Sequence, residues 1–118
     1  HTIGHAIEAA AGYSRYGHGE AVSLGMLIAS DISVRMKMLG PEAYARIERL
    51  LKDAGLPVRL RSVPTQKIIS IHYRDKKFKA GRNRFVLLAG IGRAKVIENI
   101  SLLIIKKSLA KESIPAAC

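Results

Sequence analysis

The chain has 118 residues, 48% of them hydrophobic and 25% charged, which is enough to bury a core and argues against intrinsic disorder. It contains no apolar run long enough to cross a bilayer and no recognisable signal peptide, so we expect no membrane partner. The single cysteine, Cys118, is the last residue. An internal disulfide is therefore excluded, and we expect a reducing, cytoplasmic location.

The net charge of +11 is unevenly placed along the chain. Residues 1–56 contain six basic and six acidic residues, whereas residues 57–118 contain fourteen basic and three acidic ones. A surface of this kind attracts phosphate groups, either of nucleic acid or of a phosphorylated small molecule. Composition does not distinguish these two partners.

Two helices are predicted in the first third of the chain. An alanine-rich segment over 2–11 ends at Gly12, a residue typical of helix C-termini. A longer helix is expected from 19 to 39, before a Gly-Pro pair. Its first half, 21–29, is apolar nearly all round, which predicts a buried central helix. Gly25 would let a neighbouring helix approach this one closely.

An amphipathic helix is predicted over 42–54, ending before Gly55. Its apolar face is expected to contain Tyr44, Ile47, Leu50, Leu51 and Ala54. A short helix with Thr65 as its cap is expected over 66–73, although its isoleucine-rich centre would also suit a strand.

The second half ends in a β-hairpin and a helix. A basic loop precedes segments 85–88 and 94–98, which are rich in strand-forming residues and flank a glycine-containing turn. Ser101 is a suitable cap for a last helix over 102–111. The fold class we expect is therefore mainly α, with about five helices and one small β-hairpin.

We expect one domain over residues 1–112 and a flexible tail over 113–118. Because the chain begins with His1 rather than methionine, and because its most distinctive motif begins there too, we expect a piece of a longer protein.

The residues that suggest chemistry lie in the first twenty positions. His1, His5 and Glu8 are spaced i, i+4 and i+7, which places them on one helix face, and a glycine-flanked His18 begins the next helix. Two imidazoles and an oxygen ligand would suit zinc, with Glu8 or a backbone carbonyl fixing a histidine tautomer. The alternative is an amphipathic helix that carries histidines without binding metal.

Read as a whole, the pattern is more specific. Several blocks occur in the same order and spacing as in 3-dehydroquinate synthases, and together they cover about residues 1–105. They are His1-Thr-Ile-Gly-His-Ala-Ile-Glu8, His18-Gly-Glu-Ala-Val-Ser-Leu-Gly-Met26, Asp75-Lys-Lys77 with Gly81, Arg84-Phe-Val-Leu-Leu88 and Ile91-Gly92. The chain closely resembles the helical C-terminal domain of that family. We expect the N-terminal, NAD-binding domain of that family to lie outside the 118 residues of this chain.

The resemblance implies a function and site residues. These enzymes convert 3-deoxy-D-arabino-heptulosonate 7-phosphate (DAHP) to 3-dehydroquinate in the shikimate pathway, using NAD and a divalent metal, Zn²⁺ or Co²⁺. By motif position, His1 and His18 would be metal ligands, and His18 would also contact substrate. His5 would transfer protons near the substrate phosphate. Lys76 or Lys77 would bind the anionic groups of the substrate.

The resemblance also implies partners. The absent domain would provide NAD, the third metal ligand and further substrate contacts, and the parent enzyme would be a homodimer. We therefore expect the isolated chain to be inactive. The alternatives are another sugar-phosphate cyclase of the same superfamily, a metal-dependent polyol dehydrogenase or, from a different class, a basic helical module that binds nucleic acid. We expect no nucleic-acid partner, because no helix-turn-helix or aromatic stacking signature is present.

Other notable residues have simpler interpretations. His72 is expected to be a surface or partly buried histidine rather than a ligand, and Tyr16 to shape the loop before His18. Met26, Met36 and Met38 fit core packing.

Overall fold

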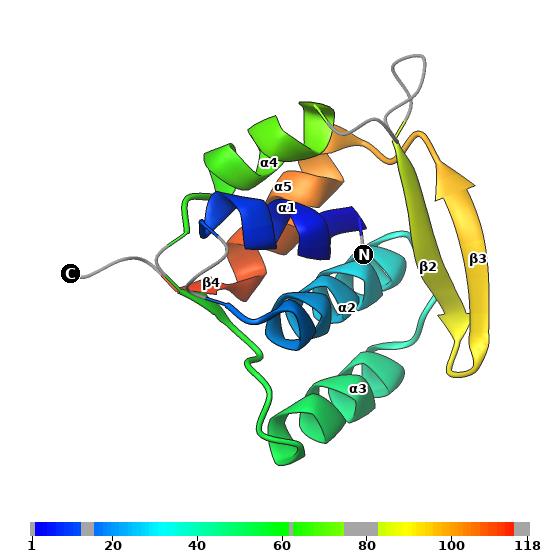
Figure 1. Ribbon diagram of the computed structural model, residues 1–118. Helices are drawn as coiled ribbons and strands as arrows, with labels where there is room; N and C mark the ends of the chain where they lie inside the picture. The colour runs from blue at the N-terminus through cyan, green and yellow to red at the C-terminus, as the bar shows by residue number, and fades with distance from the viewer. Residues whose placement is uncertain (1, 13–15, 62, 75–82, 115–118) are drawn as a thin grey trace.

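The computed structural model describes residues 2–12, 16–61, 63–74 and 83–114. Its helices and strands are arranged around one central helix (Figure 1). In chain order they are α1 (Thr2–Ala10), α2 (His18–Arg35), α3 (Pro41–Asp53), β1 (Leu60–Arg61), α4 (Thr65–Arg74), β2 (Arg84–Gly90), β3 (Arg93–Glu98), α5 (Leu102–Glu112) and β4 (Ser113–Ile114). The predicted mainly α fold with one small hairpin is confirmed.

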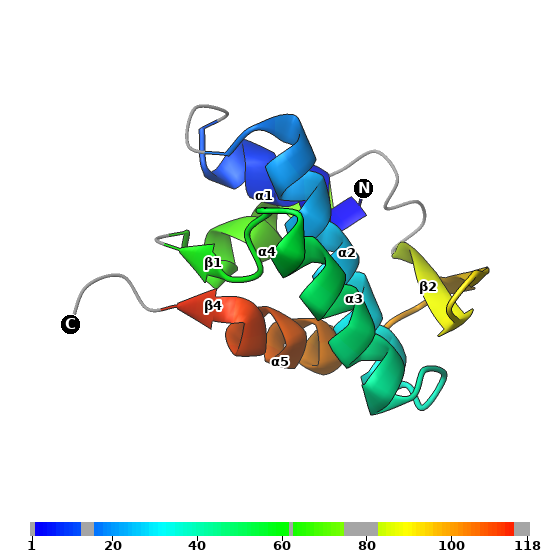
Figure 2. The same ribbon diagram turned by 90° about the horizontal axis from the view of Figure 1, so that it is seen from below.

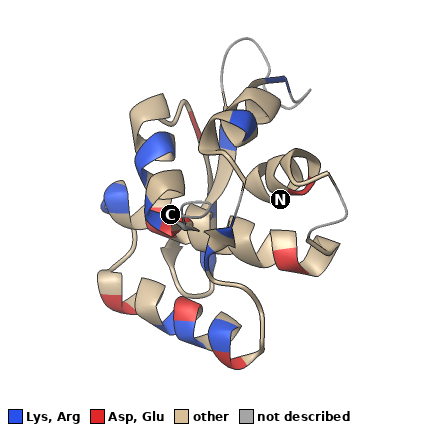
Figure 3. Cartoon of the chain, turned by 90° about the vertical axis from the view of Figure 1, so that its left-hand side faces the viewer, with Lys and Arg blue, Asp and Glu red and all other residues tan. Residues whose placement is uncertain are grey.

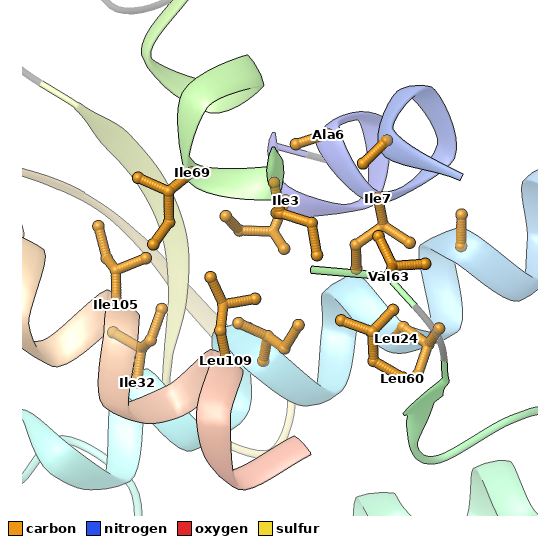
Figure 4. Close-up of a cluster of buried hydrophobic side chains, with 14 of the residues drawn as sticks. Ile3, Ala6, Ile7, Leu24, Ile32, Leu60, Val63, Ile69, Ile105 and Leu109 are labelled. Carbon is orange, nitrogen blue, oxygen red and sulfur yellow. The ribbon is translucent and has the colours of Figure 1, made fainter. Parts of the chain in front are cut away.

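Helix α2 is the centre of the molecule, as its apolar sequence predicts. Helices α1, α3 and α5 and strand β2 all pack against it. The main core lies between α1, α2, α4 and α5, and its aliphatic side chains interdigitate as Figure 4 shows. Leu24, Ile28 and Ile32 of α2 are fully buried there. Burying a side chain of this size contributes about 1.5–3 kcal/mol, so this cluster dominates the stability of the domain.

Helix α2 ends one turn earlier than the sequence suggested. Lys37 adopts the left-handed conformation, with φ of 61°. Its N–H donates to Val34 O and the next N–H, of Met38, donates to Ser33 O. These two bonds form a Schellman ending, which normally uses glycine at the position that Lys37 occupies. The predicted end at 39 is therefore wrong, because the residue that ends the helix is a lysine and not the glycine by which such an ending is usually recognised in a sequence.

Helix α3 begins at Pro41, one residue before the predicted start at 42, and packs on α2 through a second, smaller core. The Gly-Pro pair that was expected to end the preceding helix provides the N-cap and the first residue of α3. That core contains the buried Tyr44 and Leu51. Leu50, predicted to lie on the apolar face, is 69% exposed, and Ala54 is also exposed. Helix α3 packs mainly against a single helix, α2, which lies behind it in Figure 2, so only a narrow stripe of α3 is covered. The exposure of Leu50 places it outside that stripe. Acidic and basic residues alternate along its outer surface, at the bottom of Figure 3.

Strands β2 and β3 form the predicted antiparallel hairpin, with Val86 opposite Val96. Phe85 and Leu87 point into the main core, while the two valines on the other face are each 59% exposed. Met26 of α2 is 44% exposed, which corrects its assignment to the core, whereas Met36 and Met38 do pack against the core.

Asn83 links the hairpin to α5. Its side-chain amide donates to Ile100 O at 2.7 Å, and its side-chain oxygen accepts from Ile100 N at 2.6 Å. Ser101 then caps α5 by accepting from Leu103 N, as predicted.

One pairing was not predicted. Leu60 and Arg61 form a parallel pair of very short strands with Ser113 and Ile114. The first two residues of the expected tail 113–118 are thus paired with β1, and residues 115–118 lie outside the described residues. Within the described ranges, no helix combines the length and the hydrophobicity that a membrane crossing requires.

Candidate active site at the α1–α2 corner

Helices α1 and α2 run antiparallel, side by side, so that the end of α1 meets the start of α2 (Figure 1). We call this place, which contains His5, Glu8 and His18, the α1–α2 corner. His18 is the first residue of α2, directly after the N-cap Gly17. The Glu20 side chain accepts a hydrogen bond from Gly17 N at 2.8 Å, which satisfies a backbone donor that the helix itself leaves unpaired. The Glu20 side chain therefore holds the backbone directly before His18 at the start of the helix.

The structure brings together three of the side chains that the sequence singled out. His18 Nδ1 lies 3.4 Å from Glu8 Oε1, and the His5 and His18 ring centroids are 6.2 Å apart. The His18 side chain is 60% exposed, whereas that of Glu8 is only 14% exposed. A histidine from the start of one helix is thus oriented by a largely buried carboxylate of the other.

This geometry suits a metal-binding histidine. In the tautomer with its proton on Nδ1, His18 donates to Glu8, and Nε2 carries the lone pair that a metal requires. Carboxylate–histidine pairs of this kind commonly orient imidazole ligands of Zn²⁺ and Co²⁺. The described residues do not, however, contain a group of three side chains that could hold a metal ion. His18 and Glu8 therefore fit one ligand and its supporting carboxylate, and not a complete site.

Three predicted site residues, His1, Lys76 and Lys77, lie outside the described residues. Their neighbours in the sequence can be placed. Thr2 Oγ1 donates to Arg84 O at 3.3 Å, which joins the start of α1 to the start of β2. Helix α4, which ends at Arg74, packs against α1. The described residues on either side of the 75–82 segment thus belong to elements that border α1.

Tyr16 shapes the corner, as the sequence suggested, through a contact that the sequence did not reveal. Its ring is buried, and its hydroxyl accepts from Arg61 N at 2.9 Å and donates to Arg61 O at 3.4 Å. The residue two positions before His18 is therefore anchored to β1. Only the tertiary structure could identify this partner, because 45 residues separate the two positions.

His72 does not belong to the site. It is buried on α4, with its ring centroid 5.4 Å from that of Phe85. The prediction that it is no ligand is consistent with this position, but its expected exposure was wrong. It lies on the face of α4 that also buries Ile68 and Ile69.

A second polar cluster, not predicted, lies at the other end of α2. Buried Glu112 accepts a hydrogen bond from the Tyr44 hydroxyl and pairs with Arg59 at 3.1 Å, while buried Asp31 pairs with Arg35 and Lys111. Burial raises the pKa of Glu112 above its usual range, despite the opposing effects of Tyr44 and Arg59. Burial also raises the pKa of Asp31, but hydrogen bonds from Arg35 and Lys111 outweigh it and leave this pKa lowered.

This second cluster is structural. Asp31 is thirteen residues after His18 on a straight helix, which corresponds to about 20 Å. Its contacts join α2, α3 and α5 to one another. It contains no histidine or cysteine, and each carboxylate is paired with a cation of the chain.

Comparison with known proteins identifies the family. Residues 1–78 match the family model described as 3-dehydroquinate synthase C-terminal. The chain belongs to the 3-dehydroquinate synthase C-terminal family. The matched region contains the whole α1–α2 corner and the sequence positions of His1, Lys76 and Lys77.

Relatives in this family extend the match to nearly the full chain. A 3-dehydroquinate synthase of Acidithiobacillus ferrooxidans is 41% identical over 109 residues, covering 92% of this chain and 30% of the relative. One of Nitrosospira multiformis is 40% identical over 111 residues, covering 94% of this chain and 30% of the relative. The chain thus spans about a third of the length of the curated 3-dehydroquinate synthases that it matches.

A solved structure shares the fold. The crystal structure of 2-deoxy-scyllo-inosose synthase complexed with carbaglucose-6-phosphate, NAD⁺ and Co²⁺ matches with a TM-score of 0.79 and 26% identity. The match covers 95% of this chain and 33% of that one. The dehydroquinate synthase C-terminal fold therefore also occurs in a 2-deoxy-scyllo-inosose synthase.

Proposed function

We propose that the chain is the metal- and substrate-binding part of a 3-dehydroquinate synthase, which converts DAHP to 3-dehydroquinate and phosphate. The observation that carries this proposal is the pairing of His18 Nδ1 with Glu8 beside the His5 ring. It lies within the region that matches the family. Relatives about 40% identical are 3-dehydroquinate synthases, which favours DAHP over an uncarboxylated sugar phosphate.

The proposed site residues bind either the metal or the substrate, and His18 does both. His18 and His1 bind the metal, either Zn²⁺ or Co²⁺, and Glu8 holds His18 in the tautomer that binds through Nε2. When bound, the metal acts as a Lewis acid on an oxygen of the substrate. His18 also lies against the substrate.

His5 moves a proton. Its ring lies next to that of His18, on the exposed side of α1, so a substrate held by His18 would be within reach of it. An imidazole can take or give a proton near neutral pH, which suits a step in which phosphate leaves and a neighbouring carbon loses a proton.

Lys76 or Lys77 binds the anionic groups of the substrate as a point charge. The chain's large positive charge in its second half supports such a role. NAD and the third metal ligand would come from the part of the enzyme that this chain does not span, with the site between the two domains. The enzyme would act in the cytoplasm as a homodimer, without nucleic acid.

A chimera tests the proposal. This chain would replace the matching segment of the Acidithiobacillus ferrooxidans relative, and phosphate release would be measured with DAHP and with an uncarboxylated sugar phosphate. We expect release from DAHP, and a loss of at least about 100-fold on His5→Ala, typical of a missing acid–base group. The unaltered relative is the control. A folded chimera that binds NAD and releases phosphate only from the uncarboxylated substrate would point to another cyclase.

A further inference from the structure

Helices α1 and α2 touch through their backbones, at two glycines that lie one turn from Glu8 on α1 and two turns from His18 on α2. A Cβ on Gly25 would lie 2.9 Å from Gly4 N and 3.1 Å from Gly4 Cα. A Cβ on Gly4 would lie 3.1 Å from Ala21 O. No other residue fits at Gly25 without a backbone shift, since real Cβ atoms essentially never come closer than 3.0 Å to such atoms.

The helix faces that make this contact also carry the site. On α2, His18, Ala21 and Gly25 are spaced i, i+3 and i+7, so they share one face. On α1, Gly4 and Glu8 are spaced i and i+4 and likewise share a face. The antiparallel helices therefore meet at two successive points, Gly4 against Gly25 and Glu8 against His18.

We propose that Gly4 and Gly25 are positioning residues, which set the distance between α1 and α2 at which Glu8 can orient His18. This inference rests on the proposed function for its chemical meaning. The geometry leaves little tolerance. Relieving a 2.9 Å contact to the ordinary 3.4 Å requires a shift of about 0.5 Å. The His18–Glu8 distance is already 3.4 Å, so a similar shift there would break the hydrogen bond.

The contact point lies about 6 Å from Glu8 along α1, the rise of four residues, and about 10 Å from His18 along α2, the rise of seven residues. A rigid, close-packed helix transmits a displacement over one or two turns with little loss. The glycines therefore act through Glu8 and His18 rather than by touching substrate or metal.

The test compares Gly25→Ala with two controls in the 118-residue chain. Gly19→Ala makes the same chemical change in the same helix, where an added Cβ meets nothing within 4 Å. Leu51→Ala removes a buried side chain from the α3 core and destabilises the fold without touching α1. Two quantities are measured by NMR: the nuclear Overhauser effect between the His5 and His18 rings, and the broadening of the His18 ring by millimolar Co²⁺.

We expect Gly25→Ala to weaken the nuclear Overhauser effect between the His5 and His18 rings. We also expect it to reduce the Co²⁺ affinity about tenfold or more, as is usual when a supporting contact of a metal ligand is lost. Both controls should retain wild-type values. Gly4→Ala, with the milder contact, should show a smaller change in the same direction. A wild-type ring geometry in Gly25→Ala, together with a stability loss like that of Leu51→Ala, would overturn the inference. If Co²⁺ left the wild-type His18 ring unaffected, the metal assignment would fail, while the ring geometry would still decide the role of the glycines.

Discussion

Replacing Tyr44 with phenylalanine should destabilise the domain, because it removes the hydrogen bond that the Tyr44 hydroxyl donates to Glu112. Tyr44 is 8% exposed and Glu112 is fully buried, so water cannot replace the lost donor. A hydrogen bond to a buried charged group contributes about 1.5–3 kcal/mol. For a domain of this size, a loss of that magnitude lowers Tm by roughly 6–12 °C.

The effect should depend on pH. Burial raises the pKa of Glu112 in the folded state above the unfolded value of 4.5. The stability that Glu112 itself contributes is therefore fully present below pH 4.5, and it is lost as pH rises through the folded pKa and Glu112 ionises. The Tyr44 hydroxyl stabilises the ionised carboxylate, so the penalty of Tyr44→Phe should be largest at neutral pH and should shrink in acid.

Urea unfolding followed by circular dichroism, at pH 7 and at pH 4, measures this. Leu50→Ala, at a residue of the same helix that is 69% exposed, is the control and should change stability by less than about 0.5 kcal/mol. Combining Tyr44→Phe with Glu112→Gln completes a double-mutant cycle, in which we expect a coupling of about 1 kcal/mol or more. A Tyr44→Phe penalty below about 0.5 kcal/mol at pH 7 would refute the reasoning.

Three further predictions concern other parts of the chain. Tyr16→Phe should cost about 1–2 kcal/mol in chemical denaturation, because Arg61 N loses its acceptor, and an unchanged midpoint would contradict this. The pKa of Asp31 is lowered from 3.8, so the stability that Asp31 contributes is present above pH 3.8 and is lost as pH falls through the folded pKa. In Asp31→Asn, the free energy of unfolding measured against pH should therefore fall less steeply in acid than in the wild type. An equally steep fall would count against the pairing with Arg35 and Lys111. The isolated chain should neither convert DAHP nor bind Zn²⁺ tightly, and either full turnover or a sub-micromolar affinity in calorimetry would defeat that prediction.

The sequence predicted most of the fold because its local signals agree with the tertiary structure. The Ser101 cap of α5 and the glycine-containing turn of the hairpin each have a direct physical reason in the residues themselves. The predictions were wrong where tertiary contacts, and not local sequence, determine where a helix ends or which side chains are buried. Lys37 ends α2 in a conformation that lysine seldom adopts. Leu50 is exposed because α3 has little else than α2 to pack against.

The candidate site was predictable in its residues but not in its geometry. The spacing of His5, Glu8 and His18 indicated a common site, and the family resemblance assigned their roles. Whether Glu8 lies within hydrogen-bond distance of His18 depends on how closely α1 and α2 approach, and therefore on Gly4 and Gly25. The β1–β4 pairing and the Tyr16–Arg61 contact each join segments that are 45 or more residues apart, so no local sequence pattern predicts them.

The central claim is that His18, oriented by Glu8, is a metal ligand. The most direct measurement is the metal content of the purified chimera, by plasma mass spectrometry, with His18 intact and in His18→Ala. The account predicts about one Zn²⁺ or Co²⁺ per intact chain, a strong reduction in His18→Ala and an intermediate content in Glu8→Ala, consistent with the 10–100-fold loss of affinity typical of a missing supporting carboxylate. An unchanged metal content in folded His18→Ala protein would contradict it.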